Sequence, residues 1–121
     1  MSILCIDNSD TIRRVVEDCV LDLNYKFFEA ENGQIGLEKA ENIDDLRLVI
    51  IDWNMPVMSG KETLVQFRNM YPDVLLLVLI KFEKKDEVML AIELGANDYM
   101  LKPFGVNELQ NKIKEIIENA E

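Results

Sequence analysis

The stretch that most constrains the fold is residues 48–60, where an apolar, β-branched run stops abruptly at Asp52. Such a run is typical of a strand that is buried on both faces of a parallel sheet. A loop follows, and Ser59 with Glu62 three residues later has the pattern of a capping box at the start of a helix. We therefore predict that Asp52 lies at the carboxyl end of an inner strand, where open α/β sheets bind their ligands.

Length, composition and charge favour one globular domain over residues 1–121. Hydrophobic residues make up 49 % of the 121 residues, which is enough for one buried core. The net charge of -10 disfavours direct binding to nucleic acid or to an anionic membrane. No apolar run reaches the ~20 residues of a membrane span, and the first residues lack the pattern of a signal peptide. We expect a cytoplasmic protein.

Cysteine and histidine usage limits the kinds of catalytic and metal site that this chain could form. Cys5 and Cys19 both fall inside apolar patterns, so we expect two buried, reduced thiols. The chain has no histidine, which excludes zinc sites of the usual kind, Ser-His-Asp catalysis and a phosphohistidine on this chain.

The order of apolar runs predicts the fold class. Short runs at residues 3–6, 25–30, 48–51, 74–80 and 99–101 read as strands, and segments with helical spacing separate them. Either Ser9 or Asp10 is suited to cap the first helix. A strand followed by a helix, repeated five times, predicts a parallel sheet with helices on both faces. In the third and fourth helices the spacing predicts the inward residues Leu64, Phe67, Met70, Val88, Ala91 and Ile92.

Charged residues end three of the predicted strands. Asp7, Asp52 and Lys102 each follow an apolar run, and Asn8 stands beside Asp7. The carboxyl ends of parallel strands meet at one edge of the sheet, so we expect these side chains to converge. Two carboxylates and an amide oxygen are hard ligands that suit Mg²⁺. Together with the lysine ammonium, such an ion would neutralise the charge on a phosphoryl group in transfer.

Several motifs give the chain a specific family resemblance over nearly its whole length. They are Asp7 with Thr11-Ile12-Arg13-Arg14, Asp52-Trp53-Asn54-Met55-Pro56 with Gly60, Gly95-Ala96, and Tyr99-Met100-Leu101-Lys102-Pro103-Phe104. With these motifs the chain resembles response-regulator receiver domains, most of all the stand-alone, CheY-like chemotaxis type. The resemblance implies a three-layer, flavodoxin-like (βα)5 sandwich with strand order 2-1-3-4-5.

The resemblance also implies roles for the residues at the strand ends. Asp52 would accept a phosphoryl group from a histidine kinase or phosphotransfer protein. Lys102 would pair with that group, aimed by a cis bond to Pro103. The protein would not be an enzyme on a separate substrate, since it would promote only its own phosphorylation and dephosphorylation. The Mg²⁺ ligands would be Asp7, Asn8, Asp52 and the backbone carbonyl of Asn54.

In the family, a switch connects the phosphorylation site to a partner surface. A hydroxyl residue after the fourth strand and an aromatic residue, here Tyr99, form this switch. A downstream protein target would bind the fourth helix, fifth strand and fifth helix. We interpret Trp53 as a surface-loop aromatic near the site.

Three positions depart from the family pattern. Asn8 stands where a second acid is usual, and the switch hydroxyl falls at Ile80, which has none. Lys81 stands where a small residue usually admits the phosphoryl group. These departures leave an alternative open: a receiver-fold interaction module whose phosphorylation-dependent switching is weak or lost.

Other functions fit the sequence less well. A flavin site lacks a Gly/Ser/Thr-rich phosphate loop after the first strand. Residues 7–11 match the D-x-S-x-T string of a metal-dependent adhesion site, but that domain needs a larger chain and further ligands. A dehalogenase-type phosphatase needs a second Asp where Asn54 or Ser9 stands.

Overall fold

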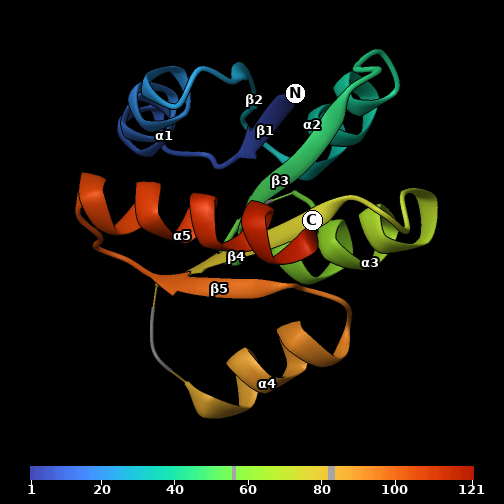
Figure 1. Ribbon diagram of the computed structural model, residues 1–121. Helices are drawn as coiled ribbons and strands as arrows, with labels where there is room; N and C mark the ends of the chain where they lie inside the picture. The colour runs from blue at the N-terminus through green and yellow to red at the C-terminus, as the bar shows by residue number, and fades with distance from the viewer. Residues whose placement is uncertain (56, 82–83) are drawn as a thin grey trace.

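The computed structural model describes residues 1–55, 57–81 and 84–121 (Figure 1). All strand pairs are parallel, in the order β2-β1-β3-β4-β5. The predicted fold class and strand order are therefore confirmed. The elements are β1 (Ser2–Ile6), α1 (Asp10–Asp22), β2 (Lys26–Ala30), α2 (Gly33–Ala40), β3 (Leu46–Asp52), α3 (Gly60–Met70), β4 (Leu75–Ile80), α4 (Lys85–Glu93), β5 (Asp98–Leu101) and α5 (Val106–Ala120).

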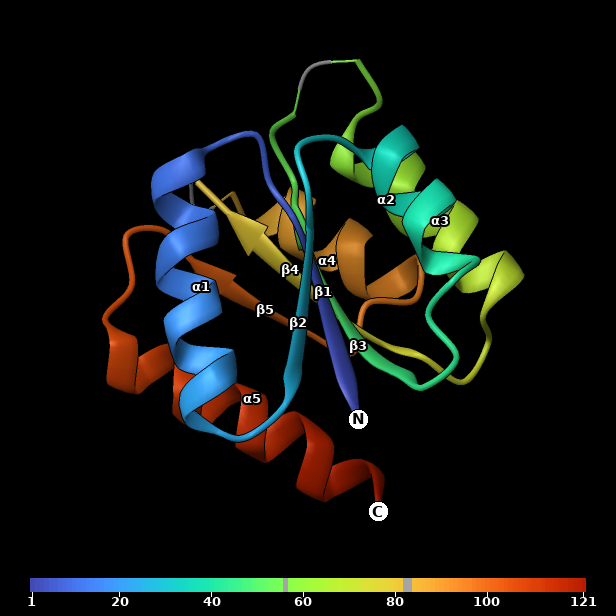
Figure 2. The same ribbon diagram turned by 90° about the horizontal axis from the view of Figure 1, so that it is seen from above.

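The helices cover the two faces of the sheet and bury β1, β4 and all of β3 after its first two residues. Helices α1 and α5 lie on one face, and α2, α3 and α4 lie on the other (Figures 1 and 2). Alternate residues of β1 point to opposite faces of the sheet. Cys5 packs toward α1 and α5, while Leu4 packs toward α2, α3 and α4. This two-sided burial explains why the inner strands read as unbroken apolar runs. No helix in the described ranges is long and apolar enough to cross a membrane.

Side-chain caps fix where the helices begin at the carboxyl edge of the sheet. The Ser9 hydroxyl accepts a hydrogen bond from the backbone N–H of Ile12 at 3.2 Å, so Ser9 rather than Asp10 caps α1. The Ser59 hydroxyl accepts from the backbone N–H of Glu62 at 3.1 Å, as the capping-box pattern predicts. These caps set the length of the two loops that follow β1 and β3.

Two predicted core positions are wrong. Met70 is 50 % exposed and Ile92 is 44 % exposed. Met70 is the last residue of α3, and the last buried residue of this helix is Phe67, one turn earlier. In α4 the described buried residue is Ala91 alone, so this helix rests on the sheet through a narrow stripe that does not reach Ile92.

Trp53 is also placed differently from the prediction, because it is buried rather than on a surface loop. Its exposed fraction is 8 %, and its backbone N–H donates to the Leu79 carbonyl at 2.9 Å, which extends the β3–β4 ladder beyond Asp52. The start of α3 then folds back over it. A Cβ on Gly60 would lie 2.4 Å from the Trp53 Cα, so only glycine fits this close approach.

Candidate functional site

The predicted convergence at the carboxyl edge of the sheet is confirmed. Asp7 follows β1, Asp52 ends β3 and Lys102 follows β5. The Lys102 Nζ lies 2.8 Å from Asp7 Oδ2 and 3.2 Å from Asp52 Oδ1. Both carboxylates are almost fully buried, with exposed fractions of 0 % and 1 %. The predicted cis peptide between Lys102 and Pro103 is likewise confirmed.

Asp7 is held from three directions. Its Oδ1 accepts from the Ser9 backbone N–H at 2.9 Å, and its Oδ2 accepts from Lys102. Its backbone carbonyl accepts from Arg13 Nη1 at 2.6 Å. Asp7 is therefore a fixed anchor for the Lys102 ammonium.

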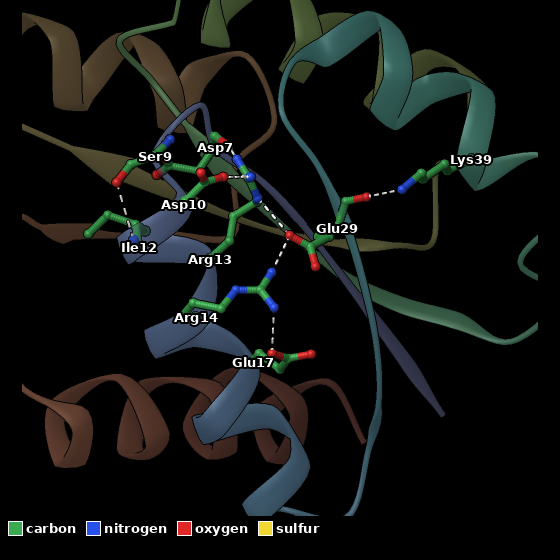
Figure 3. A network of polar contacts seen from close by, with 9 residues as sticks. All are labelled: Asp7, Ser9, Asp10, Ile12, Arg13, Arg14, Glu17, Glu29 and Lys39. Carbon is green, nitrogen blue, oxygen red and sulfur yellow. Dashed lines mark hydrogen bonds and ion pairs between the residues drawn. The ribbon is translucent and has the colours of Figure 1, made fainter.

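Arg13 is a site-supporting residue to which the sequence analysis assigned no role. It is buried, and its Nε donates to Glu29 Oε1 on β2 at 2.7 Å while Nη2 contacts Asp10 (Figure 3). Arg14 also binds Glu29, and this bond, with help from Arg13, holds the pKa of the Glu29 carboxyl below its usual range. The network ties α1 to the ends of β1 and β2.

A signal for Arg13 was present in the sequence. It lies three residues before Val16 and seven before Val20, both fully buried, so it belongs to the inward stripe of α1. A charged residue on such a stripe needs a buried partner. The partners, the Asp7 carbonyl and Glu29, come from other elements and could not be read from local spacing.

The charges of Asp52 and Lys102 depend on each other. Burial raises the pKa of the Asp52 carboxyl and the nearby Asp7 charge adds to this, while Lys102 opposes both effects. Burial acts to lower the pKa of Lys102, but its hydrogen bond to Asp7 and the attraction of Asp52 outweigh burial, so this pKa lies above its usual value. Lys102 therefore stays charged and favours the ionised form of Asp52.

An open cavity of about 590 Å³ lies over Asp52. The Asn54 backbone N–H donates to Asp52 Oδ1 at 3.2 Å, and the Asn54 side-chain Oδ1 accepts from the Lys81 backbone N–H at 3.4 Å. Asn54 therefore links the phosphoacceptor candidate to the end of β4. The lining residues are Asn8, Ser9, Ile12, Asp52, Asn54, Lys81, Lys102 and Pro103.

The cavity offers oxygen donors of the kind that Mg²⁺ binds, but few of them are charged. Asn8 lines the same cavity as Asp52 and Asn54, so an amide oxygen and a backbone carbonyl accompany the carboxylates. Within the described residues, His, Cys, Asp and Glu side chains form no group of three or more that could hold a metal ion. Lys102 already binds both carboxylates. The donor set fits Mg²⁺ in type and has little charge to attract it.

The candidate switch residues lie on the β4–β5 side of the site. Ile80 is fully buried at the end of β4 and pairs in register with Leu101. Tyr99 is half-buried and lines two surface cavities of about 380 and 570 Å³, one against α4 and one against the start of α5. Tyr99 is therefore accessible from the α4-β5-α5 surface.

Comparisons with known proteins agree with this fold. Residues 3–114 match the family described as response regulator receiver domain. The chain is 32 % identical to the chemotaxis protein CheY1 of Helicobacter pylori over 120 residues, which cover 97 % of each chain. It is 31 % identical to the chemotaxis protein CheY of Pseudomonas aeruginosa over 123 residues, with 99 % and 98 % coverage. The structure of chemotaxis protein CheY4 of Vibrio cholerae is similar, with a TM-score of 0.89 at 27 % identity and coverage of 95 % and 97 %.

Proposed function

The chain belongs to the response-regulator receiver domain family, and we propose that Asp52 accepts a phosphoryl group from a partner histidine kinase or phosphotransfer protein. One observation carries this assignment. The Lys102 ammonium bridges Asp7 and Asp52 at the floor of an open cavity, in a chain where these residues are far apart in sequence. Phosphoryl transfer depends mainly on positioning and on neutralising charge, and this arrangement supplies both.

In the proposed reaction, an Asp52 carboxylate oxygen attacks the phosphorus of the donor. The new bond is an acyl phosphate P–O bond, and the bond from phosphorus to the donor nitrogen or oxygen breaks with its electron pair on the donor. Lys102 and the Asn54 N–H both bind Asp52 Oδ1, so they orient the carboxylate. Asp7 keeps the Lys102 ammonium in place, where it neutralises charge on the phosphoryl oxygens.

Mg²⁺ would be held by Asp7, Asn8, Asp52 and the Asn54 carbonyl, and when bound it would supply positive charge next to the phosphoryl group. The neutral Asn8 amide makes this binding weak, because a strongly hydrated ion needs charged ligands to offset its loss of water.

The output surface that we propose is the face of α4, β5 and α5, where a downstream protein target would bind. Tyr99 lies between the two cavities on this face. A change in the position of Tyr99 would alter the shape of both cavities and so connect Asp52 to the partner surface.

A second candidate function is an interaction module with weak switching. Ile80 favours it, because this fully buried residue has no hydrogen-bond donor for a phosphoryl oxygen. A ligand shifts a conformational equilibrium only by its differential interaction with the two states, so the lost donor weakens the coupling.

The test is reaction with acetyl phosphate and Mg²⁺, followed by intact-mass measurement. We expect the chain to gain the mass of one phosphoryl group and the Asp52→Asn variant to gain none. If the variant is modified to the same extent, the assignment to Asp52 is wrong. If neither is modified under saturating donor, the interaction module is the better account.

A further inference from the structure

The cavity over Asp52 carries an unexpected balance of charge. Three of the described lining residues are charged, and two of them, Lys81 and Lys102, are positive. With Asp7 behind Lys102, two lysines match two carboxylates, so the site is balanced in charge although the whole chain has a net charge of -10. Fixed positive charge at the mouth of a concave site attracts anions.

Lys81 and Lys102 occupy matching positions on neighbouring strands. Ile80 and Leu101 are register partners at the ends of β4 and β5, and each lysine follows directly. The Lys102 backbone N–H donates to the Ile80 carbonyl at 2.9 Å, which continues the ladder to this point. Paired strands lie ~4.8 Å apart, so two like charges leave the backbone side by side at the same cavity. A phosphoryl group on Asp52 adds negative charge to this cavity, and both ammonium groups attract it.

The backbone of Lys81 is hydrogen-bonded to the loop that follows Asp52. Its N–H donates to the Asn54 side chain at 3.4 Å, and the Asn54 N–H binds Asp52. The lysine at position 81 is therefore attached to the same loop that orients the Asp52 carboxylate.

We propose that Lys81 is a second phosphoryl-binding cation, and that Lys81 and Lys102 together bind the oxyanion on Asp52 with little need for Mg²⁺. The inference rests on the proposed function and extends it. Two departures from the family pattern act in the same direction: Asn8 removes one negative charge, and Lys81 adds one positive charge. Their combined effect equals the charge of one divalent cation.

Beryllofluoride mimics a phosphoryl group without covalent transfer, so its affinity with and without Mg²⁺ measures Mg²⁺-independent binding at Asp52 directly. Its bound form is followed by fluorine NMR during titration, once in metal-depleted buffer and once with Mg²⁺. We expect the unmodified chain to bind in both buffers with affinities that differ by less than about threefold. In metal-depleted buffer Lys81→Met should bind about tenfold more weakly, as expected for the loss of one charge-assisted contact, and Mg²⁺ should restore part of the loss.

Two variants control for nonspecific charge effects. Lys84→Met removes the same charge from an exposed residue that is absent from the cavity lining, and it should leave both affinities unchanged. Lys81→Arg keeps the charge and should retain Mg²⁺-independent binding. Both lysines are exposed, so thermal unfolding of the variants should match that of the unmodified chain.

Two results would overturn the inference: no binding by the unmodified chain in metal-depleted buffer, or equal binding by Lys81→Met. Acetyl phosphate labelling with saturating Mg²⁺ separates this failure from that of the proposed function. If Asp52 is labelled with Mg²⁺ but beryllofluoride binding requires the metal, only the role of Lys81 fails. If Asp52 is not labelled under any condition, the proposed function fails.

Discussion

The Lys102 Nζ lies 2.8 Å from Asp7 Oδ2 across a sequence separation of 95 residues. Its distance to Asp52 Oδ1 is longer, at 3.2 Å. The lysine is thus anchored on the acid that is not the proposed phosphoacceptor. This arrangement leaves the ammonium in the cavity when the charge on Asp52 changes, and there it opposes burial and Asp7, which both raise the pKa of the Asp52 carboxyl.

Replacing Lys102 should change the pH dependence of phosphorylation. The attack requires ionised Asp52, and burial with the Asp7 charge already raises the pKa of its carboxyl above the usual value, against the effect of Lys102. In Lys102→Met this pKa rises further, so the acid limb of the rate profile moves to higher pH. At neutral pH the reaction with acetyl phosphate should be roughly 100-fold slower. Lys112→Met removes a lysine that pairs with Asp98 away from the site, and it should leave the pH–rate profile unchanged. If the acid limb does not move in Lys102→Met, the proposed effect of Lys102 on Asp52 is wrong.

Asn8→Asp should tighten Mg²⁺ binding about tenfold, because a second carboxylate joins the cavity. It should also raise the pKa of the Asp52 carboxyl through repulsion between like charges. Trp53 is buried and follows Asp52 directly in the chain, so its fluorescence is the signal to follow in the titration. Binding that is unchanged or weaker would show that residue 8 does not contact the metal.

Ile80→Thr combined with Lys81→Ala should strengthen the coupling between Asp52 and Tyr99. The threonine hydroxyl would supply a donor for the bound oxyanion, a contact worth roughly 1.5–3 kcal/mol. The measurement is the NMR shift change over residues 84–115 when saturating beryllofluoride and Mg²⁺ are added. We expect a small change in the unmodified chain and a larger one in the double variant. A large and equal response in both would mean that the hydroxyl is dispensable.

Arg68→Met should destabilise the fold without affecting phosphorylation. At the edge of the sheet opposite the site, the Arg68 guanidinium donates to the carbonyls of Gly95 at 2.7 Å and Val74 at 2.8 Å, and to Asn97 Oδ1 at 2.9 Å. Removing these bonds should lower the free energy of unfolding by about 2–3 kcal/mol. Arg68→Lys should recover only part of the lost free energy of unfolding, because lysine lacks the planar set of donors. Chemical denaturation measures the stability, and a loss below ~0.5 kcal/mol would refute the role.

The main features of the fold and site could be predicted because they depend on simple patterns. Apolar runs with short connections give a parallel sheet, and a parallel sheet brings residues at its strand ends together, as observed for Asp7, Asp52 and Lys102. The bond that Lys102 makes to each acid follows from charge once they are close.

The errors arose where burial depends on neighbouring elements. The sequence predicts Trp53 at the surface, but the extra ladder bond to Leu79 and the return of the chain at Gly60 bury it. Ile92 fits the helical period, yet α4 meets the sheet too narrowly to bury it. No local pattern records such contacts.

The most direct test of the account is to locate the acyl phosphate. After reaction with acetyl phosphate, borohydride reduces an aspartyl phosphate to homoserine, and tandem mass spectrometry of the peptides identifies the converted residue. We predict conversion at position 52 alone. Conversion at another acid, with Asp52 unchanged, would contradict the assignment of the phosphoacceptor.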